Sequence, residues 1–244
     1  MVKKNINYNV SEEKFIEYMI NDERIVGVYN AIDKVNITPA NHGMKHILNV
    51  LDIADKFLSL YMFIEKGELI IKTALILHDI GQVDGRENHG YKSMIFAKNY
   101  LENFNIFTTT ELEMIYSAIE THDECYDYSL LKNEFSWLVN MIDKFDFAKN
   151  RLEKDYKERF EYSVYEDIDH LEFSRTKKDL TIKIIKIDNP KIICQKKLFE
   201  RNLFSKAMLT FIKYCEKFNY VPKVYLGEEE IDLTALDKSV IVAR

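Results

Sequence analysis

The sequence predicts a mostly α-helical fold with a small α+β part at its C-terminal end. Hydrophobic residues make up 47% of the 244 positions and only seven Gly and three Pro interrupt them, which is typical of a compact, helix-rich protein. Apolar residues recur at helical spacing up to about residue 153. From Leu180 to Ile187 the pattern changes to β-branched residues, which favour strands. We therefore expect an all-helical domain over residues 1–165 and an α+β appendage over residues 170–244.

Six segments show the apolar spacing of a helix. They begin near residues 11, 41, 69, 89, 110 and 129. The first is expected to run to about residue 33, and the last to about residue 153. A capping box of Thr110 and Glu113 predicts the start of the fifth helix. The third segment, LIIKTALILHDIG, is apolar on nearly every side, so we expect a buried helix. Gly81 would end it in the left-handed conformation that stops helices.

The chain after Lys154 predicts a different kind of structure. Residues 155–178 are charged and irregular in pattern. The segments Leu180–Ile187 and Ile192–Cys194 flank an Asp-Asn-Pro turn, which predicts a hairpin. The remaining expected elements are one helix and two short strands, at about 197–218, 224–226 and 231–233.

Charge and cysteine content narrow the classes of function. The net charge of −6 argues against a protein that coats nucleic acid. Three widely spaced cysteines without a CxxC motif predict reduced thiols of a cytoplasmic protein. The N-terminus lacks a signal-peptide pattern, and no apolar run approaches the ~20 residues of a membrane span. Residues 175–201 hold nine Lys or Arg against three acids, which fits either the solvated face of a hairpin or a guide for an anionic substrate.

Six residues of metal-ligand type lie on the inward faces or at the ends of the predicted helices. They are His46, His78, Asp79, His89, His122 and Asp143. Four imidazoles and two carboxylates can hold two divalent ions, and the mixed nitrogen and oxygen ligands suit Mn, Fe, Co, Ni or Zn better than Mg. The alternative is a group of core histidines and buried ion pairs.

Asp79 is central in this set and is the natural bridge, with one oxygen for each ion. His46, His78 and Asp143 would complete one site, and His89 with His122 the other. Two ions ~3.5–4 Å apart lower the pKa of a shared water and clamp the attacking and leaving oxygens of a phosphoryl centre. The set therefore predicts a phosphohydrolase in which a metal-bridging hydroxide attacks phosphorus.

The order of these residues resembles a known family. His46 in HILNV and the His-Asp doublet in LHDIG match the H…HD…D signature of the HD-domain superfamily of metal-dependent phosphohydrolases, and Asp143 in MIDKFD matches its last member. His89 and His122 match the two extra histidines of binuclear members. The resemblance covers about residues 41–150. It implies an all-α bundle with metals between its helices and hydrolysis of phosphoesters, mostly of nucleotides.

Two departures from the family pattern bear on the substrate. Many relatives follow HDIG with Lys, which reaches phosphate, where this chain has Gln82, and the GYP motif of cyclic-dinucleotide phosphodiesterases reads GYK here. Both departures argue against cyclic di-GMP. Arg86 and Lys144 are candidates for the missing phosphate contact. His42 can contact phosphate, support a ligand or cap a helix, and Asp146 can orient a ligand.

The leading hypothesis is a binuclear phosphohydrolase for a nucleotide or another small phosphorylated substrate, without stable nucleic-acid binding. Two alternatives stay open. A mononuclear nucleotidase would leave His89 and His122 unused. A non-catalytic HD module that senses a nucleotide or binds a protein partner would not need the complete ligand set. No sequence feature indicates an oligomeric state.

Overall fold

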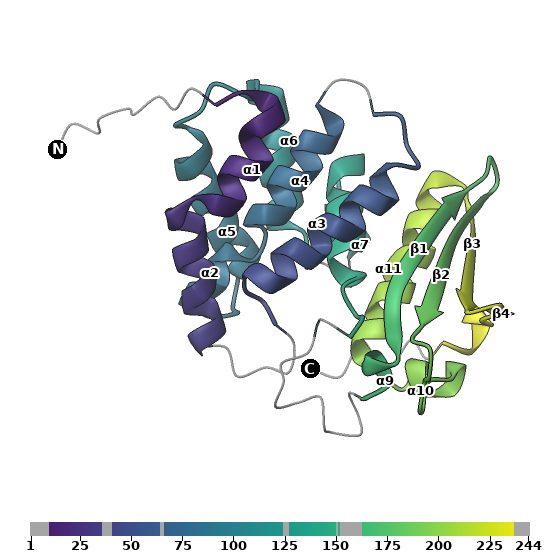
Figure 1. Cartoon of the computed structure of the whole chain (residues 1–244). Helices are drawn as coiled ribbons and strands as arrows, with labels where there is room; N and C mark the ends of the chain where they lie inside the picture. Colours follow the sequence, from purple (N-terminus) through teal and green to yellow (C-terminus); the bar gives the residue numbers. More distant parts are fainter. Residues whose placement is uncertain are drawn as a thin grey trace. The chain divides into compact units, whose positions relative to one another are not determined.

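The computed structural model describes residues 10–35, 41–63, 66–123, 127–149, 151 and 163–236. They are mostly helical with one four-stranded sheet, which confirms the predicted fold class (Figure 1). The chain forms two compact units that interleave along the sequence. The first holds residues 1–36, 42–47 and 63–140, and the second holds residues 37–41, 48–62 and 141–244. The domain boundary expected between residues 165 and 170 stays a prediction.

The first unit is a group of helices around α4. Its elements are α1 (Glu12–Asn21), α2 (Glu23–Val35), α4 (Gly67–Leu77), the 3-10 helix η1 (Ile80–Asp84), α5 (His89–Leu101), α6 (Thr109–Glu120) and the 3-10 helix η2 (Tyr128–Leu130). Two further helices, α3 (Met44–Leu58) and α7 (Glu134–Lys144), contribute residues to both units. Residues Thr73 to Leu77 of α4 are all buried, and α4 packs against α1, α5 and α6. The predicted buried helix is confirmed.

The first predicted helix is broken at Asp22. The backbone of Asp22 is extended (φ −69°, ψ 119°). The Asp22 carboxylate accepts hydrogen bonds from the backbone N–H and the Nε of Arg24, both at 2.9 Å. Asp22 therefore ends α1 and caps α2. The prediction of one helix over residues 11–33 is wrong here, because a short carboxylate offers the backbone a partner that competes with the helix.

Helices α6 and α7 begin at different residues from those predicted. The capping box of α6 forms between Thr108 and Glu111, two residues before the predicted pair. For α7, the side chain of Asn133 accepts the backbone N–H of Ser136 at 2.9 Å, so the helix begins at Glu134 and not near residue 129. The helix ends at Lys144 and not near residue 153.

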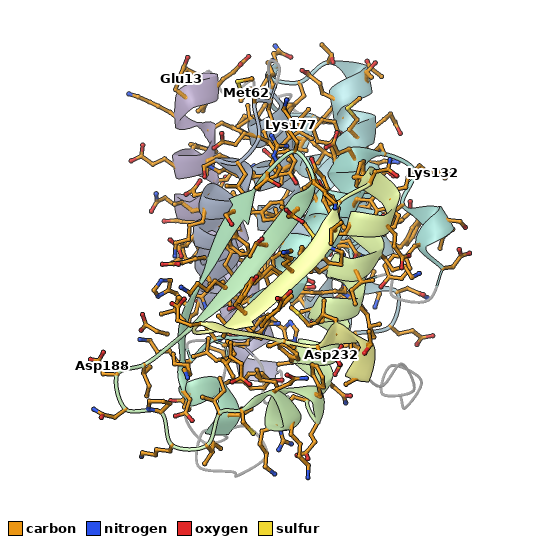
Figure 2. The ribbon with its side chains drawn as sticks, turned by 90° about the vertical axis from the view of Figure 1, so that its right-hand side faces the viewer. Glu13, Met62, Lys132, Lys177, Asp188 and Asp232 are labelled. Atoms are coloured by element: carbon orange, nitrogen blue, oxygen red, sulfur yellow. The ribbon has the colours of Figure 1, made fainter. Side chains whose placement is uncertain are left out.

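The second unit contains the sheet and its covering helix. Its elements, besides parts of α3 and α7, are α9 (Ser163–Glu166), β1 (Ile168–Arg175), β2 (Asp179–Lys186), α10 (Gln195–Phe199), α11 (Asn202–Phe218), β3 (Val221–Leu226), β4 (Glu229–Glu230) and the 3-10 helix η3 (Leu233–Ala235). The strand order is β1-β2-β3-β4, with β2 and β3 parallel and the other pairs antiparallel. Figure 2 shows the longer strands side by side, with Lys177 at the turn between β1 and β2. Leu180, Ile182 and Ile184 of β2 are buried, as strand alternation requires.

The predicted hairpin is wrong in its partner strand. Strand β2 pairs with β1, which lies in the segment expected to be irregular. Only Ile168 and Leu171 of β1 are buried, so its charged residues conceal the strand pattern. Residues 192–194 form no strand, and the backbone N–H groups of residues 191–193 donate to the Asp167 carboxylate at 2.7–3.0 Å.

The C-terminal helix and strand also differ in their bounds from the prediction. The helix expected at 197–218 is divided into α10 and α11, and the last strand is β4 and not residues 231–233. In the basic segment, Lys183 forms an ion pair with Glu228 at 2.5 Å, and Lys197 forms one with Glu200 at 3.2 Å. These pairs favour the solvated-face interpretation of that segment.

The structure describes two of the three cysteines. Cys194 and Cys215 are free thiols, while Cys125 lies outside the described residues. In the described part of the chain, no helix combines the length and apolar character needed to cross a membrane.

Candidate metal centre

Five side chains of metal-ligand type meet inside the first unit. They are His46, His78, Asp79, His89 and His122, and none is more than 7% exposed. They form two groups that share Asp79, one with His46 and His78 and the other with His89 and His122. Within each group the ligand atoms lie within 4.8 Å of one another. The first unit thus contains a buried His/Asp cluster that can hold metal ions.

Asp79 directs one carboxylate oxygen to each group. Its Oδ1 lies 3.3 Å from His89 Nε2 and 3.2 Å from His122 Nε2. Its Oδ2 lies 3.6 Å from His78 Nε2 and 4.0 Å from His46 Nε2. The paired Nε2 atoms are 3.3 Å apart in His46 and His78, and 3.0 Å apart in His89 and His122. This is the placement expected of a carboxylate that bridges two cations.

Three of the imidazoles make the same local hydrogen bond, in which the ring Nδ1 donates to the backbone carbonyl three residues earlier. The distance is 2.7 Å for His78, 2.9 Å for His89 and 2.7 Å for His122. Because a carbonyl only accepts, Nδ1 carries the proton, and the lone pair of Nε2 is left for another partner. Histidines that bind metals almost always have such a bond on the other ring nitrogen.

The arrangement of lone pairs tests whether a metal fits. The Nε2 lone pairs of neutral His89 and His122 would face each other across 3.0 Å, and both also face Asp79 Oδ1. Such an electron-rich, buried arrangement is unfavourable unless a cation lies among the three atoms. A divalent ion, or failing that a proton, meets this requirement, so the donor set fits a metal.

These contacts also shift the protonation equilibria. Burial acts to raise the pKa of Asp79, but the close imidazoles of His78, His122, His42 and His89 hold that pKa well below its usual range. Burial acts to lower the pKa of His89, yet its bond with Asp79 raises the pKa above the ordinary value. Burial lowers the pKa of His122. The cluster therefore keeps its carboxylate charged and His122 neutral, which are the forms that coordinate a metal.

Gly81 is needed for close packing and not for a left-handed turn. It lies within η1, whereas the positive φ angles of this loop belong to Gly85 (90°) and Asn88 (52°). A Cβ on Gly81 would lie 2.5 Å from both the carbonyl oxygen of His89 and the backbone nitrogen of Ser93. Its own N–H donates to Ser93 Oγ at 2.8 Å. The predicted left-handed conformation is wrong, and the glycine instead brings the Asp79 turn against the helix that carries His89.

Gly90 has the equivalent role between α5 and α6. A Cβ there would lie 2.6 Å from the carbonyl oxygen of Glu120, in the last turn of α6. This close approach places His89, the first residue of α5, beside His122, which follows the end of α6. The prediction that His122 points into the core is confirmed, since it is 1% exposed.

His42 lies beside the cluster without belonging to either group. Its Nδ1 is 2.9 Å from Asp79 Oδ2, and Gln82 Nε2 lies 3.4 Å from the same nitrogen. Both side chains are buried. Of the roles considered for His42, the contact with Asp79 favours the support of a ligand.

The other predicted site residues lie elsewhere or keep an untested role. Arg86 is exposed, and its backbone carbonyl is the group that accepts His89 Nδ1. Asp143 and Lys144 are half-buried at the end of α7, in the second unit, so their roles as ligand and phosphate contact stay predictions. Asp146, in the same unit, accepts hydrogen bonds from Asn49 and Arg151, both at 3.2 Å.

Comparison of the sequence with protein-family models finds no match, and comparison with curated proteins also finds none. The resemblance to the HD superfamily therefore rests on the site itself. Its buried His/Asp cluster, in the chain order H…HD…H…H, is compatible with an HD-type centre.

Proposed function

We propose that this protein is a binuclear metal-dependent phosphohydrolase of the HD type that acts on a nucleotide or another small phosphoester. The observation that carries this proposal is the position of Asp79, whose two oxygens face two separate pairs of histidine Nε2 atoms. A single-ion site would need only one of these pairs. The net charge of −6 disfavours a long polyanion and leaves a small substrate as the better fit.

His46 and His78 would hold one divalent ion together with Asp79 Oδ2, and His89 and His122 the other together with Oδ1. Asp143 is the residue we expect to complete the first site. Divalent ions bound there would polarise a phosphoryl group and lower the pKa of a water molecule. The excess of imidazole over carboxylate favours Mn, Fe, Co, Ni or Zn over Mg.

The residues beside the ligands supply orientation and a proton. We assign the leaving-group proton to His42, a buried imidazole beside the cluster whose Nδ1 lies 2.9 Å from Asp79 Oδ2. Buried Gln82 brings no charge, so a cation for the phosphate must come from another residue. Exposed Arg86 is our candidate, since its backbone is fixed by His89 while its side chain is in solvent.

Metal analysis joined to a substrate screen tests the proposal. After metal-replete purification, the full chain should contain two ions and hydrolyse bis-p-nitrophenyl phosphate or a nucleotide when Mn is added. Asp79→Ala should lose both ions, whereas His122→Ala should mainly empty one site. One ion or fewer in the unaltered protein would overturn the binuclear centre. Two bound ions without turnover of any phosphoester would overturn the enzymatic part and leave a nucleotide-sensing module.

A further inference from the structure

Asn140 on α7 holds the turn that carries His122. It is fully buried, and its Nδ2 donates to the carbonyl oxygen of His122 at 2.7 Å and to that of Thr121 at 3.2 Å. The last carbonyls of a helix have no partner within the helix and need one from elsewhere. Here the partner comes from a different helix, and one of the residues it holds is itself a candidate ligand.

The neighbouring carbonyls of this turn are also contacted. The carbonyl of Ile119 accepts the ring Nδ1 of His122 at 2.7 Å, and the carbonyl of Glu120 packs against Gly90. With Asn140 included, the backbone oxygens from residue 119 to residue 122 are each in contact with a specific group. The bond to Ile119 sets the direction of the His122 ring, and the bonds from Asn140 set the position of its backbone.

We propose that Asn140 is a positioning residue that sets the metal affinity of the group formed by Asp79 Oδ1, His89 and His122, while the group with His46 and His78 does not depend on it. This inference rests on the proposed binuclear centre. Loss of the amide would remove its hydrogen bonds to the carbonyls of Thr121 and His122 and free the end of α6 to relax. Because ligand distances must hold to within about 0.2 Å, a small relaxation is enough to weaken coordination.

The chain supplies a matched control one turn earlier on the same helix. Ser136 is fully buried on α7, and its Oγ lies 3.3 Å from Ser117 Oγ, at the start of the last turn of α6. Ser136 and Asn140 therefore both link α7 to α6 through a side-chain hydrogen bond. Only the bond of Asn140 reaches the turn with the ligand. Ser136→Ala therefore shows how the loss of one α6–α7 hydrogen bond by itself affects stability and metal binding.

The test is a metal titration of the full-length apoprotein with Co²⁺ and with Zn²⁺ against a chromophoric chelator. We compare the unaltered chain with Asn140→Ala and Ser136→Ala, and measure thermal unfolding of each. Asn140→Ala should bind the second ion, the one held by Asp79 Oδ1, His89 and His122, about 10- to 100-fold more weakly. This is the usual effect of removing a group that supports a ligand. The first ion should bind as before, and Ser136→Ala should bind both ions normally.

Double variants identify the site that is affected. In a His46→Ala background only the second group stays intact, so adding Asn140→Ala should weaken the remaining ion by the same about 10- to 100-fold. In a His122→Ala background the second group is already lost, so adding Asn140→Ala should change the affinity of the remaining ion little.

Several results would overturn the inference. They are normal binding of both ions by Asn140→Ala, equal weakening of both ions, or the same loss in Ser136→Ala at matched stability. If Asn140→Ala does not fold, Asn140→Asp decides by the same titration, because it keeps the size of the side chain and removes the donor. Failure of the unaltered chain to bind a second ion would instead overturn the proposed binuclear centre.

Discussion

Replacing Gly90 by Ala should push the start of α5 away from the end of α6. The added Cβ would lie 2.6 Å from the carbonyl oxygen of Glu120, whereas ordinary contact begins at 3.4 Å. The two helix ends must therefore separate by about 0.8 Å along this contact. The obstacle is a backbone atom, so a change of side-chain rotamer does not relieve it.

The size of this displacement can be compared with what a metal site tolerates. His89, the residue before Gly90, has its Nε2 3.0 Å from His122 Nε2 and 3.3 Å from Asp79 Oδ1. A shift of about 0.8 Å is several times the ~0.2 Å tolerance of metal–ligand distances. The backbone shifts that overpacking forces typically cost ~1–3 kcal/mol. If that cost falls on the ion-bound state, it corresponds to a metal affinity about 5- to 150-fold weaker.

The assay is the stoichiometry and affinity of Zn²⁺ or Co²⁺ in Gly90→Ala, with Gly27→Ala as the control. Gly27 is exposed in α2, and a Cβ there would meet nothing within 4 Å. Its replacement should leave metal binding unchanged and stabilise the helix by about 0.5–1 kcal/mol. An unchanged second ion in Gly90→Ala, or an equal loss in Gly27→Ala, would refute the reasoning.

Three other variants separate proton transfer, phosphate contact and acid stability. At saturating metal, His42→Ala should lose about 10²- to 10⁴-fold in kcat on a nucleotide, and its ions should bind more weakly because the contact with Asp79 is lost. The loss in kcat should be smaller on a p-nitrophenyl ester, whose leaving oxygen needs no proton, and equal losses would exclude this role. Arg86→Ala keeps the carbonyl that binds His89, so metal content should stay constant while kcat/KM falls about 10- to 100-fold; unaltered efficiency would make Arg86 a loop charge. Burial acts to raise the pKa of Asp22, but hydrogen bonds from Arg24 outweigh it and lower the pKa from 3.8 to about 2. That stabilisation is present above pH 3.8 and is lost as the pH falls through 2. Asp22→Asn should thus have a lower free energy of unfolding than the unaltered chain at pH 7, and this difference should disappear near pH 2. A difference that does not depend on pH would contradict the assignment.

The composition of the candidate site could be predicted because its residues are expensive to bury. His46, His78 and Asp79 lie on segments whose other residues are apolar, and His122 follows the apolar face of α6. Such side chains need a partner when they leave water. The helical spacing of their apolar neighbours then indicates which way they point. This reasoning needs only local sequence and covers four of the five clustered residues, whereas His89 follows a polar loop and was identified by its place at the start of a predicted helix.

The contacts that assemble the cluster were not accessible in this way, because they join residues distant in sequence. Gly90 meets Glu120, and Asn140 holds His122, in both cases across different helices. In the sequence, Gly81 has the pattern of a helix stop, and Asn140 is one polar residue among apolar ones. Strand β1 was missed for a related reason, since most of its residues face solvent or lie half-exposed and show no alternation.

The electronic state of the site and its geometry therefore have different origins. His78 lies at the end of α4, His122 follows the end of α6 and His89 opens α5, and each ring bonds to a carbonyl three residues earlier. The tautomer of each of these three rings is thus set within four residues of chain, by a local hydrogen bond. The distances among the ligands depend instead on the close approach of helices. It follows that replacing a ligand should abolish an ion, whereas replacing a residue at a helix contact should leave the ion bound but more weakly.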